Sequence, residues 1–322
     1  MTAVGTAPSI STLTGSAPVS STISVSHLSK RFGSVIAIDD LTFSVEPGQV
    51  CGFLGPNGAG KTTTLRCLLG LVKPTAGTTT IGGSSYADLP APLGTVGAML
   101  DAGSFHPGRT ARNHLRVLCA SAGLDDARAE IVLELVGLAD ARNRRVAGFS
   151  TGMRQRLGLA AALLGDPHVL VLDEPATGLD PAGINWLREL LRYLAHDEHK
   201  TVLLSSHLLA EMEHTADRIV IVSQGHLVRE GSLEDLVGHA AAVVRVRSPH
   251  TDALAAVLTE RGYRFDHTDG ALVVSGVRSD DIGHLAFVHG LEVDELTIMH
   301  EDLEDVFLQL TNPSAATQGS EP

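Results

Sequence analysis

The chain has 322 residues, of which 43% are hydrophobic, and its formal net charge is −13. This length and hydrophobic content suffice for one large domain with a sizeable core and a second, smaller domain. A strongly acidic chain without a basic block is a poor candidate for binding duplex nucleic acid, so we expect no nucleic acid partner.

The amino-terminal part predicts neither a leader peptide nor a membrane anchor. Residues 1–22 are rich in Ser, Thr, Ala, Pro and Gly, which is typical of a disordered tail, and they lack the basic start and apolar core of a signal peptide. The best apolar run, residues 157–172, is interrupted by Asp166 and Pro167, so it is too short to span a membrane.

Strands and helices alternate over the next two thirds of the chain. In chain order we expect strands between about residues 23 and 54, a helix over 62–71, a short strand over 78–83, mainly helices from about 85 to 165, a strand over 168–174, a helix over 184–195, a strand over 201–207 and a hairpin over 218–231. The continuous apolar runs at 168–174 and 201–207 are typical of strands buried on both faces of a parallel sheet.

A second pattern begins near residue 240. Its elements follow the order βαββαβ plus a last helix, which is the order of a small split-βαβ domain. In the last helix, Leu303, Val306, Phe307 and Leu310 recur at the spacing of one helical face. We therefore expect a first domain over 23–238, an α+β accessory domain over 240–312, and disordered tails over 1–22 and 313–322.

A phosphate-binding loop is predicted between the strand that ends near residue 54 and the helix that follows. Residues 55–62 read GPNGAGKT, a match to G-x-x-x-x-G-K-[ST]. Such a loop surrounds phosphates with backbone N–H groups, and a plain glycine turn would explain neither its lysine nor its threonine. The predicted nucleotide-binding residues are Gly55, Pro56, Asn57, Gly58, Ala59, Gly60, Lys61, Thr62 and Thr63.

Two acidic residues follow the apolar strand at 168–172. Asp173 at a strand end near Thr62 is predicted to hold Mg²⁺ together with the Thr62 hydroxyl, so a nucleoside triphosphate and Mg²⁺ are the expected cofactors. Glu174 is predicted to accept a proton from an attacking water. The alternative is an acidic pair that caps a helix.

The order of further motifs resembles the ATP-binding cassette (ABC) ATPases, the nucleotide-binding subunits of membrane transporters, over about residues 23–235. FSTGMRQRL (149–157) is similar to the family signature LSGGQ, with Ser150 and Gly152 matching and three other positions departing. ATGLDP (176–181) resembles the D-loop with Asp180 in place. SSHLLAEME (205–213) resembles the switch segment with His207 as the γ-phosphate contact, and RFG (31–33) places Phe32 where the family stacks a ring on adenine.

The resemblance implies the fold and the assembly. The fold is α/β, a P-loop NTPase domain of the ABC type with a RecA-like core, an antiparallel β subdomain and a helical subdomain. Two ATPase subunits, either two copies or this chain and a paralogue, face each other head to tail, so that Ser150, Gly152 and Asp180 serve the opposite chain's ATP. Glu174 and His207 are the implied catalytic residues. The implied partner is a separate transmembrane permease, with the ATPase at the cytoplasmic face of the cell membrane.

One position departs from the family pattern. Where the family has a glutamine that senses Mg²⁺, this chain has Asp101. The carboxylate could bind the metal directly, which makes Asp101 a third candidate ligand, or it could be protonated, turned aside or simply exposed. Nearby, Leu115, Leu118 and Cys119 form an apolar stripe that either contacts the permease or faces the subdomain's own core.

The carboxyl-terminal LEDVFLQLT (303–311) resembles the extension of ATP subunits that serve bacitracin- or anthracycline-type exporters. It favours export of a drug, antibiotic or other amphipathic compound over import; the alternative is that the extension covers a face or helps two copies dimerise. A soluble cassette protein outside transport, or a module that binds ATP without hydrolysing it, remain the other classes. Finally, Cys51, Cys67 and Cys119 lie in apolar contexts and predict buried thiols in a reducing compartment.

Overall fold

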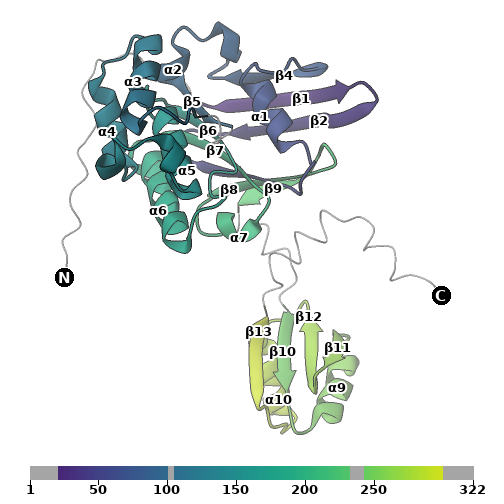
Figure 1. Cartoon of the computed structure of the whole chain (residues 1–322). Coiled ribbons are helices and arrows are strands. Elements are labelled where there is room, and N and C mark those ends of the chain that lie inside the picture. Colours follow the sequence, from purple (N-terminus) through teal and green to yellow (C-terminus); the bar gives the residue numbers. More distant parts are fainter. Residues whose placement is uncertain (1–20, 101–104, 233–242, 300–322) are drawn as a thin grey trace.

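The computed structural model describes residues 21–100, 105–232 and 243–299. These residues form a six-stranded sheet, a three-stranded sheet and a four-stranded sheet, with helices between the strands (Figure 1). The first two sheets belong to the part of the chain that carries the phosphate loop. The third is made by the carboxyl-terminal part of the described chain.

The six-stranded sheet has the order β5-β6-β7-β3-β8-β9. Its strands are β3 (Val50–Leu54), β5 (Val96–Met99), β6 (Val169–Asp173), β7 (Thr201–Ser206), β8 (Arg218–Ser223) and β9 (His226–Ser232). Neighbouring strands from β5 to β8 pair in parallel, and β9 returns antiparallel to β8. All residues of β3 and β7 are buried, which explains their continuous apolar runs.

The three-stranded sheet is antiparallel, as the resemblance implied. It consists of β1 (Ile23–Phe32), β2 (Val35–Val45) and β4 (Ala76–Ile81) in the order β2-β1-β4. The helix α1 (Lys61–Leu68) shares one hydrophobic cluster with both sheets, through Leu65 and Leu68. The amino-terminal end of α1 is thereby fixed beside the carboxyl end of β3.

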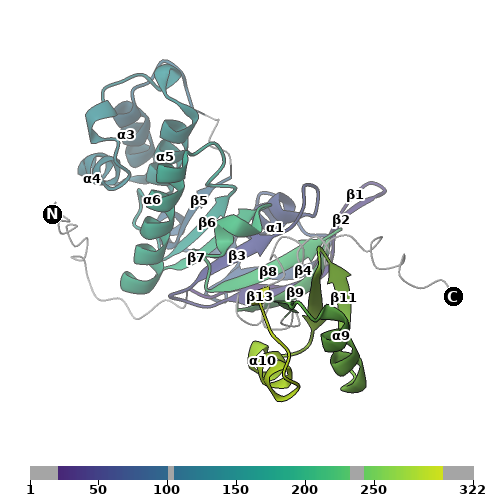
Figure 2. The ribbon, with the colours of Figure 1, turned by 90° about the horizontal axis from the view of Figure 1, so that it is seen from below.

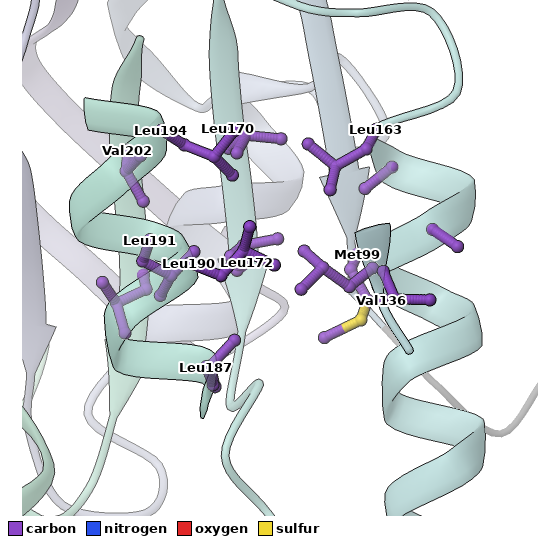
Figure 3. Packing of buried hydrophobic residues seen from close by; sticks show 14 of the residues in the cluster. Met99, Val136, Leu163, Leu170, Leu172, Leu187, Leu190, Leu191, Leu194 and Val202 are labelled. Atoms are coloured by element: carbon purple, nitrogen blue, oxygen red, sulfur yellow. The ribbon is translucent and has the colours of Figure 1, made fainter. Parts of the chain in front are cut away.

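Helices cover the other face of the six-stranded sheet and continue into a helical subdomain. The α-helices are α2 (Pro92–Thr95), α3 (Ala111–Ala122), α4 (Ala127–Leu135), α5 (Thr151–Ala162), α6 (Pro181–Arg192) and α7 (Leu209–Met212), with short helical turns at Tyr86–Asp88, Ala139–Ala141, Val146–Gly148 and Tyr193–Asp197. Figure 2 shows α3, α4 and α5 grouped together, apart from the antiparallel strands. Leucines of α6 pack on Leu170 and Leu172 of β6 (Figure 3).

The apolar stripe on α3 faces inward. Leu115 and Cys119 are each 0% exposed, and Leu118 packs against the same core cluster. Of the two interpretations left open by the sequence, the structure supports the core-facing one, because side chains buried in the subdomain offer no surface to a partner. Among the helices of the described residues, no one combines the length and the apolar character needed to cross a bilayer.

The carboxyl-terminal unit confirms the expected element order. It comprises β10 (Val243–Arg247), α9 (Thr251–Glu260), β11 (Arg264–Thr268), β12 (Ala271–Ser275), α10 (Ser279–Val288) and β13 (Glu295–Met299). The strands form one antiparallel sheet in the order β11-β12-β10-β13 around a separate hydrophobic cluster. The last predicted helix, at 303–311, lies outside the described residues.

The predicted amino-terminal tail differs from the structure at its end. Ser21 is 7% exposed, and its carbonyl oxygen accepts a hydrogen bond of 2.8 Å from the Thr201 hydroxyl. The expectation of a disordered segment through residue 22 was therefore wrong for Ser21. The composition of the segment reflects only its own polar residues, whereas Thr201, the hydrogen-bond partner of Ser21, is 180 positions away in the sequence.

Gly97 in β5 provides a test of the packing between the sheet and α5. A Cβ atom at Gly97 would lie 2.1 Å from the Ala162 carbonyl oxygen, so backbone would have to move. We expect Gly97→Ala to lower the free energy of unfolding in urea by about 1–3 kcal/mol. Gly94→Ala is the control, because its Cβ would meet nothing closer than 4.0 Å. Equal stability of Gly97→Ala and the unmodified protein would contradict this packing.

The three cysteines are free and buried, as the sequence predicted. Burial raises the pKa of the Cys51 thiol to about 12 and also raises the pKa values of Cys67 and Cys119. Because the thiolate is the reactive form, we expect the native protein at pH 8 to react with Ellman's reagent only slowly, and the denatured protein to release all 3 thiol equivalents. A fast-reacting thiol in the native protein would be inconsistent with this burial.

Candidate nucleotide site

A pocket of about 510 Å³ lies at the amino-terminal end of α1. Its lining combines the phosphate loop with residues of α5 and residues at or just after the carboxyl ends of β6 and β7. The lining residues include 56–63, Gln155, Asp173, Glu174, Thr177 and His207. The structure thus brings most of the predicted phosphate and catalytic residues to one place.

The phosphate loop requires glycine for two physical reasons. Gly60 precedes α1 with φ of 102°, which side-chain-bearing residues rarely adopt, and a Cβ there would lie 2.5 Å from the Ala37 carbonyl oxygen. The first N–H groups of α1 have no partner within the helix, and together with the helix dipole they favour an anion.

The turn between β8 and β9 connects this loop to β2 of the antiparallel sheet. The Gly225 N–H donates to the Ala59 carbonyl oxygen at 3.1 Å, and the Asp39 N–H of β2 donates to the Gly225 carbonyl oxygen at 2.9 Å. The phosphate loop is therefore joined through one residue to the antiparallel sheet.

Lys61 is 5% exposed, and oxygen atoms surround its ammonium group. Its Nζ atom donates to the Gly55 carbonyl oxygen at 2.6 Å and to the Pro56 carbonyl oxygen at 3.4 Å. The Glu174 Oε1 atom lies 3.6 Å from the same nitrogen. A buried ammonium held in this way presents a positive charge at the floor of the pocket.

Asp173 and Thr62 meet as the sequence predicted. The Thr62 hydroxyl donates to Asp173 Oδ2 at 2.7 Å, although the two residues are 111 positions apart. One hydroxyl and one carboxylate are a donor set that suits Mg²⁺, which prefers oxygen ligands and takes the rest from phosphates and water. A group of three or more His, Cys, Asp or Glu side chains able to hold a metal does not occur in the described residues. The Thr62 hydroxyl and the Asp173 carboxylate therefore fit Mg²⁺ as two of its oxygen ligands.

Glu174 and His207 also meet in the pocket. The His207 Nδ1 atom lies 2.8 Å from Glu174 Oε2, and Glu174 has a positive φ of 49°. A left-handed conformation at a residue other than glycine costs free energy and persists only where neighbours fix it. This strain at the predicted proton acceptor is typical of a functional position.

Ser205 was not predicted, although it begins the SSH sequence (205–207) that ends with His207. Its hydroxyl donates to Asp173 Oδ1 at 2.5 Å and accepts from the Glu174 N–H at 3.0 Å. The residue lies on β7, between β6 and β3, and is 0% exposed. The role of Ser205 could have been recognised from its position: it is a buried serine at a strand end, beside the neighbouring strand end that carries the two acidic residues. Ser205 orients both carboxylate-bearing residues of the site.

The other predicted site residues lie outside the pocket lining of this chain. Ser150 caps α5 by accepting from the Met153 N–H at 3.2 Å, and Asp180 caps α6 by accepting from the Gly183 N–H at 2.7 Å. Gly152 lies in the first turn of α5. Phe32 is 50% exposed at the end of β1, and Asp101 lies outside the described residues. Their roles toward nucleotide stay predictions.

Comparisons with known proteins identify the family. A family model described as "ABC transporter" matches residues 38–177, and one described as a domain of unknown function (DUF8746) matches residues 242–304. The bacitracin transport ATP-binding protein BcrA of Bacillus licheniformis is 36% identical over 91% of this chain and 98% of its own length. The chain belongs to the ABC transporter ATP-binding proteins. It resembles the bacitracin and drug-exporter branch of these ABC ATPases, binds ATP and is an ATPase.

Further relatives agree with the assignment. A Nod factor export ATP-binding protein I of Cupriavidus pinatubonensis is 35% identical over 88% of each chain. A solved ATP-binding subunit of an ABC transporter superposes with a TM-score of 0.61 at 30% identity, covering 67% of this ABC ATPase and 92% of that chain. The dimeric cassette MJ0796 bound to ADP and Pi has a TM-score of 0.60 at 24% identity over 66% of this chain and 98% of its own, which supports the fold.

Ser205→Ala tests the role of the serine that the sequence reading missed. We expect kcat for ATP hydrolysis to fall about tenfold, a barrier increase of about 1.4 kcal/mol, because both acidic residues lose an orienting hydrogen bond. The control is Ser206→Ala, since the Ser206 hydroxyl is also buried but donates to Glu211 instead. Similar kcat values for the two variants, measured by phosphate release, would argue against an orienting role of Ser205.

Proposed function

We propose that this ABC ATPase powers a separate transmembrane permease that exports a drug, antibiotic or other amphipathic compound, at the cytoplasmic face of the cell membrane. The observation that carries the catalytic part is the single pocket in which buried Lys61, the Thr62–Asp173 pair and the Glu174–His207 pair converge. Support for export comes from the names of the bacitracin transport and Nod factor export relatives.

Each group has a distinct task in hydrolysis. Lys61 neutralises the β- and γ-phosphates, while Thr62 and Asp173 would hold Mg²⁺, which supplies charge neutralisation of the phosphate oxygens when it is bound. Glu174 accepts the proton of the attacking water. His207, beside that carboxylate, orients it and contacts the γ-phosphate.

The same geometry supports a dimer as the active form. Ser150, Gly152 and Asp180 lie at the amino-terminal ends of α5 and α6, outside the pocket of their own chain. Helix starts of this kind favour phosphate, so we assign these residues to the ATP held by a second subunit, either a copy of this chain or a paralogue. ATP would then join two subunits, and its hydrolysis would release them. This change shifts the population from joined to separated subunits, and the permease converts it into transport.

Glu174→Gln tests the hydrolytic and the dimeric part together. The amide cannot accept the proton, so we expect kcat to fall at least about a hundredfold while ATP still binds. The variant should accumulate as a dimer in excess Mg-ATP, measured by light scattering after size exclusion. Glu213→Gln, an exposed change on the surface, is the control and should behave as the unmodified protein.

Two results would contradict the proposal. A monomeric Glu174→Gln protein in Mg-ATP, also in the presence of the co-purified permease, would exclude the ATP-joined dimer. Full ATPase activity of the variant would exclude Glu174 as the proton acceptor. For the export part, cells that express the chain and its permease should tolerate bacitracin-type compounds better than cells with Lys61→Ala; equal tolerance would exclude these compounds as cargo.

A further inference from the structure

Helix α5 packs closely on the turn that follows Glu174 in the same chain. Gly178 in this turn has φ of 77°, and a Cβ there would lie 2.5 Å from Thr151 Cγ2. A Cβ at Gly152 would lie 3.3 Å from Leu179 Cδ2. The first turn of α5 and the turn at residues 174–179 are therefore in direct contact, without room for an intervening side chain.

Gln155, one helical turn further along α5, makes the polar contact between these two segments. It is 9% exposed, and its Nε2 atom donates to the Thr177 carbonyl oxygen at 2.9 Å. Its Oε1 atom is buried, and the described residues provide no hydrogen-bond partner for it. Because buried polar atoms are rarely left unpaired, a side chain kept only for packing would be expected to be apolar here.

The Thr177 peptide connects this contact with Glu174. The Thr177 N–H donates to the Glu174 carbonyl oxygen at 3.2 Å, so its carbonyl is held by Gln155 and its N–H closes the turn. Glu174 itself has φ of 49°, a conformation that neighbours must enforce. Ser205 holds this residue from the β7 side, and the Gln155–Thr177 contact holds it from the α5 side.

We propose that Gln155 is a positioning residue for ATP hydrolysis. By holding the Thr177 carbonyl, it fixes the turn at residues 174–177 and with it the direction in which the Glu174 carboxylate enters the pocket. The helix that carries Gln155 begins at the Ser150 cap, so a shift of α5 displaces the donor and changes the position of the carboxylate. The inference rests on the proposed role of Glu174 as proton acceptor.

Two substitutions at Gln155 separate positioning from packing. Gln155→Leu removes the donor at similar volume; we expect kcat to fall about tenfold, and because Gln155 also lines the pocket, KM for ATP is measured alongside and is expected to change less than about twofold. Gln155→Glu restores the donor only when its carboxyl group is protonated. Its kcat, divided by the kcat of the unmodified protein at the same pH, should therefore rise at least about threefold as the pH is lowered from 8 to 6. Burial raises the pKa of a carboxyl group, so this rise is expected at a higher pH than for an exposed glutamate.

Gln49→Leu is the matched control. Its Oε1 atom is also buried without a partner among the described residues, but Gln49 precedes β3 and does not line the pocket. We expect its kcat and pH profile to equal those of the unmodified protein.

The results distinguish failure of the inference about Gln155 from failure of the proposed role of Glu174. The inference is overturned if Gln155→Leu keeps kcat within about twofold, if kcat and KM change together, or if the relative activity of Gln155→Glu is independent of pH. Glu174→Gln is measured alongside: if it hydrolyses ATP normally, the proposed proton acceptor is wrong and the positioning role fails with it. If Glu174→Gln is inactive while Gln155→Leu is normal, only the inference about Gln155 is wrong.

Discussion

A buried ammonium group must be surrounded by oxygen atoms, and this requirement organises the cassette around Lys61. Two backbone carbonyl groups of the loop and the Glu174 carboxylate supply these atoms. They can do so only because β3 and β6 both end at the same edge of a parallel sheet, with β7 between them. Ser205 of β7 then bonds to both Asp173, the last residue of β6, and Glu174, the residue after it. The fold thus surrounds an otherwise unfavourable buried charge with three oxygen atoms at the edge of the pocket.

The loop before α1 and the two acidic residues after the apolar strand were predicted because each is a short contiguous segment of the sequence. The loop at residues 55–62, and Asp173 and Glu174 at a strand end, carry their chemistry in residue types at fixed local spacing. Ser205 and Gln155 were not assigned a role, because their function depends on which strand lies between β6 and β3 and on which face of α5 meets the turn after Glu174. Such relations arise between segments that are distant in sequence, and periodicity contains no information about them.

The same limit appears in the fold. The apolar spacing on α3 could not distinguish a docking surface from a core face, since both require the same periodicity; the burial of Leu115 and Cys119 decided it. In the carboxyl-terminal unit, alternation and turn residues predicted the order βαββαβ correctly. The position of β10 between β12 and β13 follows instead from strand pairing, which only the three-dimensional structure displays.

The junction at Gly225 ties the phosphate loop to the strand by which the chain leaves the cassette. Gly225 contacts Ala59 by one hydrogen bond, and the next residues form β9, the edge strand of the six-stranded sheet, which is only 7 residues long. Because β9 pairs antiparallel with β8 as far as Ser232, the loop before α1 is coupled through Gly225 to the edge of the six-stranded sheet, and a change in the turn at Gln224–Gly225 would alter both the loop and this edge.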